Sequence, residues 1–556
     1  MLRLAPALTL AAFLAPIGAG ILGTLLPAFG VLPALGRTVL SLEPWRALFA
    51  TPGLDGTLKV TVGAGLGATL LSFLLAAGFC ALASRTRAVR ALERALAPLL
   101  ATPHVAIAVG FAFLIAPSGW IARLISPELT GWERPPDIAT VRDPLGLSFV
   151  AGLVLKEVPY LVLMMIGATG QIAARPMMAA ARSMGYPAPA AWAKVVLPQI
   201  YGQIRLPLYA VLAFSLSTVE VALILAPGHP PPLSVLAMRW FSAPDLALVF
   251  PAAAASILQL AIVVAAIGLW HAGERITAAL GRFWIARGER GGPAGPLLAA
   301  AGGLAIASGI VSLLSLAGLG LWSFTRDWPY PDDLPIRWTL SPWMRAADLS
   351  TPLTNTLAIG LAASAIAVML ALACLENEQR HRVRPGASVL LLLYLPLLVP
   401  QVAFLFGAQA VLVRLGADGT LAAVVWAHLL FVLPYAFLSL ADPYRALDPR
   451  YARIAAGLGS PPWRVFRRVK LPILIRPVLI AFAVGFAVSV GLYLPTLFAG
   501  AGRIGTLTTE AVTLASGADR RLVAVAVALQ TGLPLIAYSL ALIVPSFLHR
   551  ERRALR

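Results

Sequence analysis

Three ionisable residues lie inside long apolar runs of the sequence. Lys156 and Glu157 are adjacent in LVLKEVPYLV, and Glu220 lies in LSTVEVALIL. A charge in an apolar span is costly to expose to lipid, so by default it is a candidate for relaying protons or ions, or for lining a solute pathway. The alternative is structural, because buried charges that pair with other polar groups fix the packing of helices. The sequence leaves both interpretations open for these three residues.

The remaining polar side chains form no motif typical of an enzyme. None of the four lysines follows a glycine, so the chain lacks the GK[ST] end of a phosphate-binding loop. The six histidines are scattered, with no HExxH motif and no cluster of Cys and His at metal-ligand spacing. We therefore expect no catalytic residue, no metal and no cofactor in this chain. Its energy must come from a separate ATPase or from an ion gradient.

The composition predicts an all-α polytopic membrane protein. Of the 556 residues, 59% are hydrophobic and 12% are charged, whereas soluble proteins average about 25% charged residues. Runs of about 20 apolar residues, each long enough to cross a bilayer, recur along the whole chain. Cys80 and Cys374 lie in separate apolar runs and are expected to be free thiols.

Apolar windows predict about twelve transmembrane helices. They span residues 6–28, 57–83, 98–117, 144–168, 205–227, 246–270, 296–322, 353–374, 388–413, 420–440, 476–497 and 521–547. The first apolar run continues to about Leu32, which is longer than the apolar region of about 7–15 residues in a signal peptide. We interpret it as a retained first span.

The net charge of +19 is explained by topology rather than by nucleic-acid binding. With the N-terminus inside, 28 Lys and Arg residues lie on the inner side and 14 on the outer side, and Lys156 lies within a span. This distribution follows the positive-inside rule and predicts that both termini lie in the cytoplasm. The charge also favours contact with anionic lipids of the bilayer.

Three short motifs recur in the same order in the two halves of the chain. The matched positions are Pro103 and Pro400, Gly110 and Gly407, Pro159 and Pro434, Gly185 and Gly459, and Pro198 and Pro472. Their offset falls from 297 to 274 residues because the first half has a long loop, 118–143, where the second has only 416–419. We predict two parallel six-helix repeats, residues 1–290 and 291–556, joined by the Gly- and Pro-rich segment 288–296.

The last of these motifs lies in two predicted cytoplasmic loops, residues 175–200 and 445–474. In each copy we expect a short helix (177–184 or 451–458), a glycine turn, and a second helix that ends before the Leu-Pro pair. Topology accounts for the arginines of the second loop. It does not account for glycine, proline and leucine kept in register over 274 residues. The repeated residues are explained if each loop docks on one of two equivalent sites of a partner, as a helix held in a groove.

At these residues the chain resembles the permease subunits of binding-protein-dependent ATP-binding-cassette (ABC) importers, whose loop carries the pattern EAA…G…I-x-LP. The first copy here reads AAA, G and V-x-LP at 179–181, 185 and 195–198. The second reads RIA, G and V-x-LP at 453–455, 459 and 469–472. The glutamate of the pattern is replaced by Ala179 and Arg453. Because both copies occur in one chain, the resemblance is greatest to the fused double permeases of iron(III)- and thiamine-type importers.

The resemblance implies a MetI-like type I ABC importer permease fold and a transport subunit that is not itself an enzyme. In that family each loop inserts a coupling helix into a cytoplasmic ATPase, present in two copies, which binds the ATP. A periplasmic binding protein delivers the substrate. The positions assigned here to the two ATPase-coupling loops are Ala181, Gly185, Pro187, Trp192, Leu197, Pro198, Ala455, Gly459, Pro461, Arg464, Phe466, Arg467, Leu471 and Pro472.

A second class of function stays open at this point. Lys156, Glu157 and Glu220 could serve an ion-gradient-driven secondary transporter as an ion relay, and in an importer they could line the translocation pathway. The duplicated cytoplasmic loop distinguishes the two classes, because a secondary transporter does not need it. The transported substrate, whether thiamine, iron(III) or another small solute, is also left open by the sequence.

Overall fold

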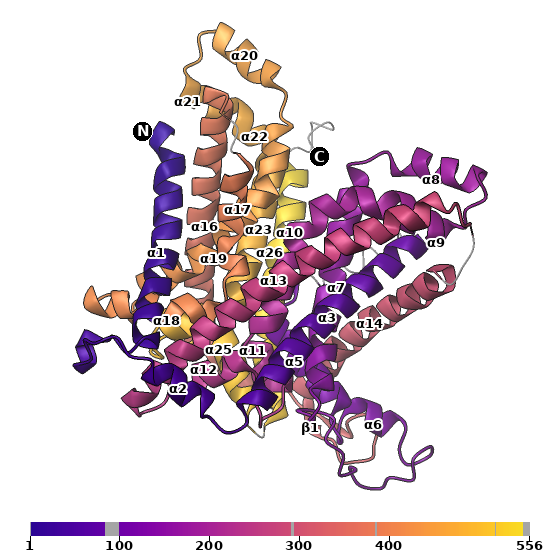
Figure 1. Cartoon of the computed structure of the whole chain (residues 1–556), viewed down its shortest axis with the longest axis vertical. Coiled ribbons are helices and arrows are strands. Elements are labelled where there is room, and N and C mark those ends of the chain that lie inside the picture. Colours follow the sequence, from indigo (N-terminus) through magenta and orange to yellow (C-terminus); the bar gives the residue numbers. More distant parts are fainter. Residues whose placement is uncertain are drawn as a thin grey trace.

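The chain folds into a bundle of long helices with one short pair of strands, as Figure 1 shows for the computed structural model. The structure describes residues 2–83, 99, 101–290, 294–383, 386–517 and 519–548. Part of the predicted linker, 291–293, and the basic segments 84–98 and 549–556 used in the orientation analysis lie outside the described residues. The all-α polytopic fold expected from the composition is confirmed.

The first half contains twelve described α-helices and four shorter helical turns. They are η1 (Leu2–Leu4), α1 (Ala5–Ala28), η2 (Pro33–Leu35), α2 (Glu43–Phe49), α3 (Leu54–Ala83), α5 (His104–Ile115), α6 (Trp120–Leu124), α7 (Leu147–Gly170), α8 (Ala174–Ser183), α9 (Ala188–Ala191), the π-helical turn η3 (Trp192–Val196), α10 (Leu197–Ser217), α11 (Glu220–Leu225), α12 (Leu233–Phe241), η4 (Leu246–Leu248) and α13 (Val249–Ala286).

The second half repeats this plan with a short hairpin near its start. Its elements are α14 (Ala294–Ser323), β1 (Thr325–Asp327), β2 (Arg337–Trp338), α15 (Ser341–Met344), η5 (Arg345–Leu349), α16 (Ser350–His381), α17 (Ala387–Leu398), α18 (Gln401–Arg414), α19 (Leu421–Arg445), α20 (Pro449–Gly457), α21 (Pro462–Val465), the π-helical turn η6 (Phe466–Lys470), α22 (Leu471–Ile473), α23 (Ile475–Gly491), α24 (Leu494–Ala499), α25 (Leu507–Ala515) and α26 (Arg520–Leu548).

Fewer continuous spans occur than the twelve predicted. Among the described residues, nine helices are long and apolar enough to cross a membrane, or up to eleven if each of two bent helix pairs is one span. The predicted span 205–227 is broken where Thr218 leaves α10 in an extended conformation before α11. The predicted span 388–413 bends by 94° between α17 and α18. Pro400 is extended there and has no N–H to continue the helix.

The first helix of each half packs against the opposite half. α1 runs along α18, and α14 runs along α3 and α5. Glycine permits both crossings, because a Cβ on Gly407 would lie 2.0 Å from Gly20 O, and one on Gly110 would lie 2.6 Å from Ser315 O. Gly110 and Gly407 are matched positions of the repeat. The two repeats therefore exchange their first helices at equivalent places.

The two loops that carry the repeated glycine motif emerge at the same end of the molecule (Figure 1). α8 and α20 project from the end at which α1 begins and α26 finishes, and we call this the loop end. The hairpin of β1 and β2 lies near α6 at the other end, which we call the opposite end. This arrangement separates two candidate regions, one at each end, with the membrane-spanning helices between them.

Candidate functional site

The first candidate coupling loop contains the predicted helix and glycine turn. α8 covers most of the predicted helix 177–184, and Gly185 follows it with φ at +87°. The N–H of Tyr186 donates to Ala181 O at 3.2 Å, and the N–H of Gly185 donates to Arg182 O at 3.0 Å. These two bonds form a Schellman motif, which places a left-handed residue after the helix and therefore favours glycine. The predicted turn at Gly185 is confirmed.

The second candidate coupling loop repeats this geometry 274 residues later. α20 covers most of the predicted helix 451–458, and Gly459 follows it with φ at +78°. The N–H of Ser460 donates to Ala455 O at 3.1 Å, and the N–H of Gly459 donates to Ala456 O at 2.9 Å. The sequence repeat therefore encodes the same hydrogen-bonded turn in both loops.

The prediction that the second helix of each loop ends before the Leu-Pro pair is wrong for both loops. In the first loop, Pro187 is extended and precedes α9, and the π-helical turn η3 follows. In η3 the N–H of Leu197 donates to Trp192 O, five residues back. Helical structure then continues into α10, where Pro198 occupies the first turn. Proline is tolerated there because its missing N–H is not needed.

In the second loop the helix also runs through the Leu-Pro pair, but it ends soon afterwards. Pro461 is extended before α21, and η6 then follows, with the N–H of Leu471 donating to Phe466 O. Pro472 lies in the three-residue helix α22, and the chain bends by 76° before α23. The two loops thus share a π-helical turn at the same position, which the sequence pattern did not predict.

The two loops differ in how much apolar surface they expose. In the second loop, Leu458 and Trp463 are 81% and 65% exposed, and Arg464 and Arg467 are exposed beside them. In the first loop, Trp192 is only 3% exposed. The other predicted loop positions are exposed (Gly185, Pro187, Pro198, Gly459, Pro461), half-buried (Leu197, Ala455, Phe466, Leu471, Pro472) or buried (Ala181).

A buried ion pair fixes the second loop to the helix bundle. The Lys470 ammonium, at the end of η6, lies 2.6 Å from the Glu376 carboxylate of α16 and 2.7 Å from Gln379 Oε1. Glu376 also accepts hydrogen bonds from Arg380, at 3.0 Å, and from the hydroxyl of Tyr444 in α19. These contacts therefore join the loop to α16 and α19.

The first loop is fixed by a different set of contacts. The Lys194 ammonium, within η3, donates to Glu289 O at 2.7 Å and lies 4.2 Å from the centre of the Trp284 ring. Both partners belong to the end of α13 and the segment just after it. The equivalent turns in the two loops are thus anchored by unrelated residues.

Lys156 and Glu157 are adjacent in the sequence, but their side chains contact different groups. The Lys156 ammonium is buried and donates to Leu99 O at 3.0 Å and to Thr102 O at 2.5 Å. These carbonyls belong to the segment that enters α5. The contacts of Lys156 therefore fit a structural role, in which its side chain holds α7 against this segment.

The buried carboxylates of Glu157 and Glu220 instead lie near His104, whose side chain is 33% exposed. The Glu157 carboxylate is 3.5 Å from His104 Nε2, and Glu220, the first residue of α11, interacts electrostatically with the same histidine. Tyr435 interacts electrostatically with Glu157, and Tyr493 with Glu220. Both tyrosines come from the second half. We call His104, Glu157 and Glu220 the membrane cluster, and it lies where the two halves meet.

Sequence reasoning missed two residues of these sites. His104 belongs to a repeat motif but was treated as one of six scattered histidines, and its pairing with Glu157 crosses from α5 to α7. Glu376 lies near the charged end of an apolar run, where the sequence alone does not distinguish it from a solvated residue. Only the position of α16 against η6 identifies it as the partner of Lys470.

Known proteins of similar sequence decide the class. The chain is 33% identical to the inner membrane ABC transporter permease protein YnjC of Escherichia coli (strain K12) over 526 residues, which are 93% of each protein. The chain belongs to the ABC transporter permeases. The permease is also 31% identical over 189 residues to the molybdenum transport system permease protein ModB of Mycobacterium tuberculosis, covering 32% of this chain and 70% of that protein.

A third relative matches about half of the permease. The thiamine transport system permease protein ThiP of Salmonella typhimurium is 26% identical over 294 residues, which are 52% of each protein. No protein-family model matches the sequence. The permease is thus a multi-pass inner-membrane subunit that forms the translocation pathway of an ABC importer, as the resemblance implied. An ATPase and a substrate-binding protein are its partners, and the secondary-transporter alternative is not supported.

Proposed function

We propose that this permease supplies both halves of an importer pathway and docks one copy of a cytoplasmic ATPase on each of its two glycine-turn loops. The observation that carries the proposal is the repeated geometry of the loops, since each has a Schellman turn followed by a π-helical turn at the loop end. In this arrangement the ATPase binds and hydrolyses ATP, and the permease itself is not an enzyme. The loop end and both termini are then cytoplasmic, and the repeats are residues 1–290 and 291–556.

Within the bilayer, we propose that the membrane cluster contributes to the solute pathway. Its two carboxylates are buried, and the cluster lies between the two halves, where relative movement of the halves would change its surroundings. We assign Lys156 a structural role instead, and its hydrogen bonds to two backbone carbonyls support this assignment. The names of two relatives give different solutes, molybdenum and thiamine. The solute class of this permease must therefore be argued from its own residues.

A matched pair of leucine variants tests the docking proposal. Leu458 on the second loop and Leu129 at the opposite end are both 81% exposed. Leu458→Asp places a charge in the proposed helix-in-groove contact and is expected to reduce co-purification of the ATPase at least tenfold. Leu129→Asp makes the same chemical change away from the contact and should leave co-purification unchanged. Equal recovery of the ATPase with both variants would contradict docking at this loop.

A further inference from the structure

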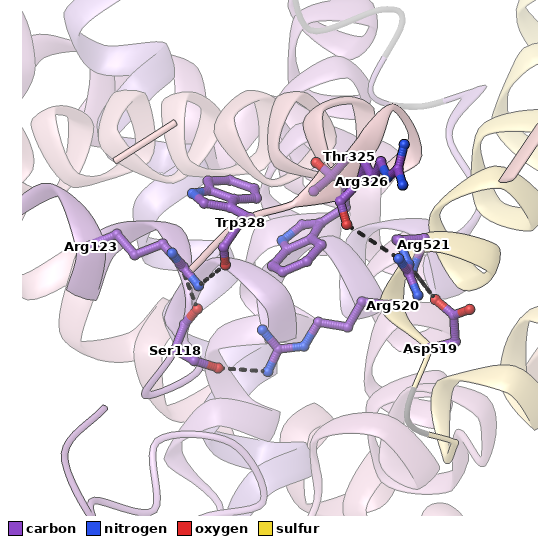
Figure 2. A pocket seen from close by; sticks show the side chains of 9 residues that line it. Ser118, Arg123, Thr325, Arg326, Trp328, Asp519, Arg520 and Arg521 are labelled. Atoms are coloured by element: carbon purple, nitrogen blue, oxygen red, sulfur yellow. Dashed lines mark hydrogen bonds and ion pairs between the residues drawn. The ribbon is translucent and has the colours of Figure 1, made fainter. Parts of the chain in front are cut away.

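A cavity of about 580 Å³ lies at the opposite end, and four of its nine lining residues are arginines (Figure 2). Its polar lining comprises Ser118, Arg123, Thr325, Arg326, Asp519, Arg520 and Arg521. These residues come from the loop before α6, from α6 itself, from β1 and from the start of α26. The cavity therefore lies where the first half, the hairpin that follows α14, and the last helix of the second half meet.

The positive charge of this cavity is only partly neutralised. Asp519 pairs with Arg521 at 3.1 Å, and it also lies 3.4 Å from Arg345 outside the cavity. Burial works against ionisation of Asp519, but hydrogen bonds from Arg521 outweigh it and hold the pKa of Asp519 below its usual value. In the described part of the chain, no carboxylate oxygen lies within 4.0 Å of a side-chain nitrogen of Arg123, Arg326 or Arg520.

Arg123 contributes a fixed charge to the cavity wall. It is only 4% exposed, and its guanidinium donates to four backbone carbonyls, those of Ser118, Trp328, Pro329 and Asp332. The carbonyls satisfy its N–H groups but do not cancel its charge. Because burial weakens solvent screening, this charge favours an anion in the adjoining space.

Arg520 is oriented to make the direct contact. Its guanidinium lies 5.3 Å from the Trp322 ring centre and 5.5 Å from that of Phe113. Among the described contacts, the side chain donates only to Ser118 Oγ, at 3.0 Å, as Figure 2 shows. Aromatic neighbours position the guanidinium without using its N–H groups. The remaining donors can form the paired hydrogen bonds that a carboxylate or phosphate accepts.

Arg520 also borders a second hollow. This hollow, of about 470 Å³, is lined by Val109 and Ala112 of α5 and by Ile224 of α11. α5 and α11 begin at His104 and Glu220, the residues of the membrane cluster. The second hollow therefore shares these two helices with the membrane cluster, and Arg520 lines both the hollow and the arginine cavity.

We propose that the arginine cavity binds a small solute through an oxyanion group, such as a carboxylate, phosphate or phosphonate. Its volume lies within the range of about 300–1,000 Å³ that is typical of small-molecule sites. Unpaired guanidinium groups favour an anion and disfavour a cation. The entry of solute from the opposite end rests on the orientation given in the proposed function. The binding of an anion in the cavity does not depend on that orientation. A bound solute would therefore carry its anionic group towards Arg520 before it reaches the membrane cluster.

Isothermal titration of the full-length permease tests the proposal without any partner protein. The protein is purified in a maltoside detergent free of phospholipid and titrated with inorganic phosphate, methylphosphonate or acetate at constant ionic strength. Saturable binding of at least one of these anions is expected. Arg520→Gln should weaken it about tenfold or more, because a charged hydrogen-bond partner is lost. The control is Arg503→Gln, which removes an exposed arginine paired with Asp418 outside the cavity and should bind as the parent does.

A second variant keeps the test decisive if Arg520→Gln does not fold. Arg326 is exposed at the cavity, so Arg326→Gln removes a charge with little loss of packing and should weaken anion binding severalfold. Equal affinities of the parent, Arg326→Gln and any folded Arg520→Gln protein would overturn the proposal. So would binding of phosphatidylglycerol in place of the free anions, which would identify a lipid site. Loss of binding-protein association in Arg520→Gln without any anion binding would instead identify a protein-docking surface.

These results separate the inference from the proposed function. Anion binding is measured without the ATPase, and Leu458→Asp leaves the cavity intact. Failure of ATPase docking together with retained anion binding would therefore remove the proposed function alone. Retained docking with no anion binding would remove the cavity proposal alone.

Discussion

Lys470 and Glu376 form a buried ion pair, 2.6 Å between ammonium and carboxylate, that joins the second loop to α16. Both side chains are 7% exposed. The loop carries the exposed residues Leu458 and Trp463, one before and one after its glycine turn. The ion pair therefore links this loop to α16, and the hydroxyl of Tyr444, which donates to Glu376, extends the contact to α19. The first loop lacks an equivalent ion pair, since Lys194 bonds to backbone carbonyls instead.

Removing one member of this pair is expected to be strongly destabilising. Glu376→Gln leaves the Lys470 charge buried without its partner, which typically costs about 3–5 kcal/mol. The double variant Glu376→Gln, Lys470→Met should recover part of this loss, because no unpaired charge remains. Thermal unfolding in detergent measures both. Asp418→Asn breaks the exposed pair with Arg503 and serves as the control, with an expected cost of about 0–1 kcal/mol.

The left-handed glycines of the two loops should respond differently to alanine. Both have positive φ, so Ala costs about 1–2 kcal/mol at either position. At Gly185 an added Cβ would also lie 3.3 Å from Arg290 Cδ, whereas nothing lies within 4 Å of a Cβ at Gly459. We therefore expect Gly185→Ala to lower the unfolding temperature more than Gly459→Ala. Gly457→Ala is the control, because Gly457 is helical and has open space around its Cβ position.

Variants of Lys156 and Glu157 are expected to distinguish a structural role of the first residue from a transport role of the second. Lys156→Met removes a buried ammonium that bonds two backbone carbonyls, and we expect lower thermal stability of the folded permease, by about 1–3 kcal/mol. Glu157→Gln keeps the size of the side chain but removes the charge facing His104. We expect it to reduce solute uptake at least tenfold in reconstituted vesicles with ATPase binding retained. Normal uptake by Glu157→Gln would remove the membrane cluster from the pathway.

Much of the fold was accessible from the sequence because apolar runs and repeated motifs are local signals. Gly185 and Gly459 were placed correctly, since a Schellman turn needs only its own residues. The break near Thr218 was missed because apolar composition continues across it. The continuation of the helix through Pro198 was missed for a related reason. A Leu-Pro pair marks a helix end unless a π-helical turn changes the hydrogen-bond register first.

The membrane cluster and the arginine cavity depend on contacts between distant segments. His104 and Glu157 are 53 residues apart, and Arg520 reaches Ser118 across 402 residues. No periodicity or motif in the sequence encodes either contact. The outer arginines were counted only as part of the smaller charge on the outer side, because their grouping arises from the packing of β1, α6 and α26.

The crossing of α1 and α18, where the first helix of one half packs on the other half, is expected to depend on Gly20. A Cβ on Gly20 would lie 2.3 Å from Phe404 O, so Gly20→Ala must push the helices apart, and such overpacking typically costs about 1–3 kcal/mol. Gly18→Ala, in the same helix, meets nothing within 4 Å and should be neutral or slightly stabilising. Thermal unfolding of the two variants measures the difference. Because α1 clamps the opposite repeat, Gly20→Ala should also speed proteolysis between the two halves, and equal cleavage of both variants would argue against a structural role for the exchange.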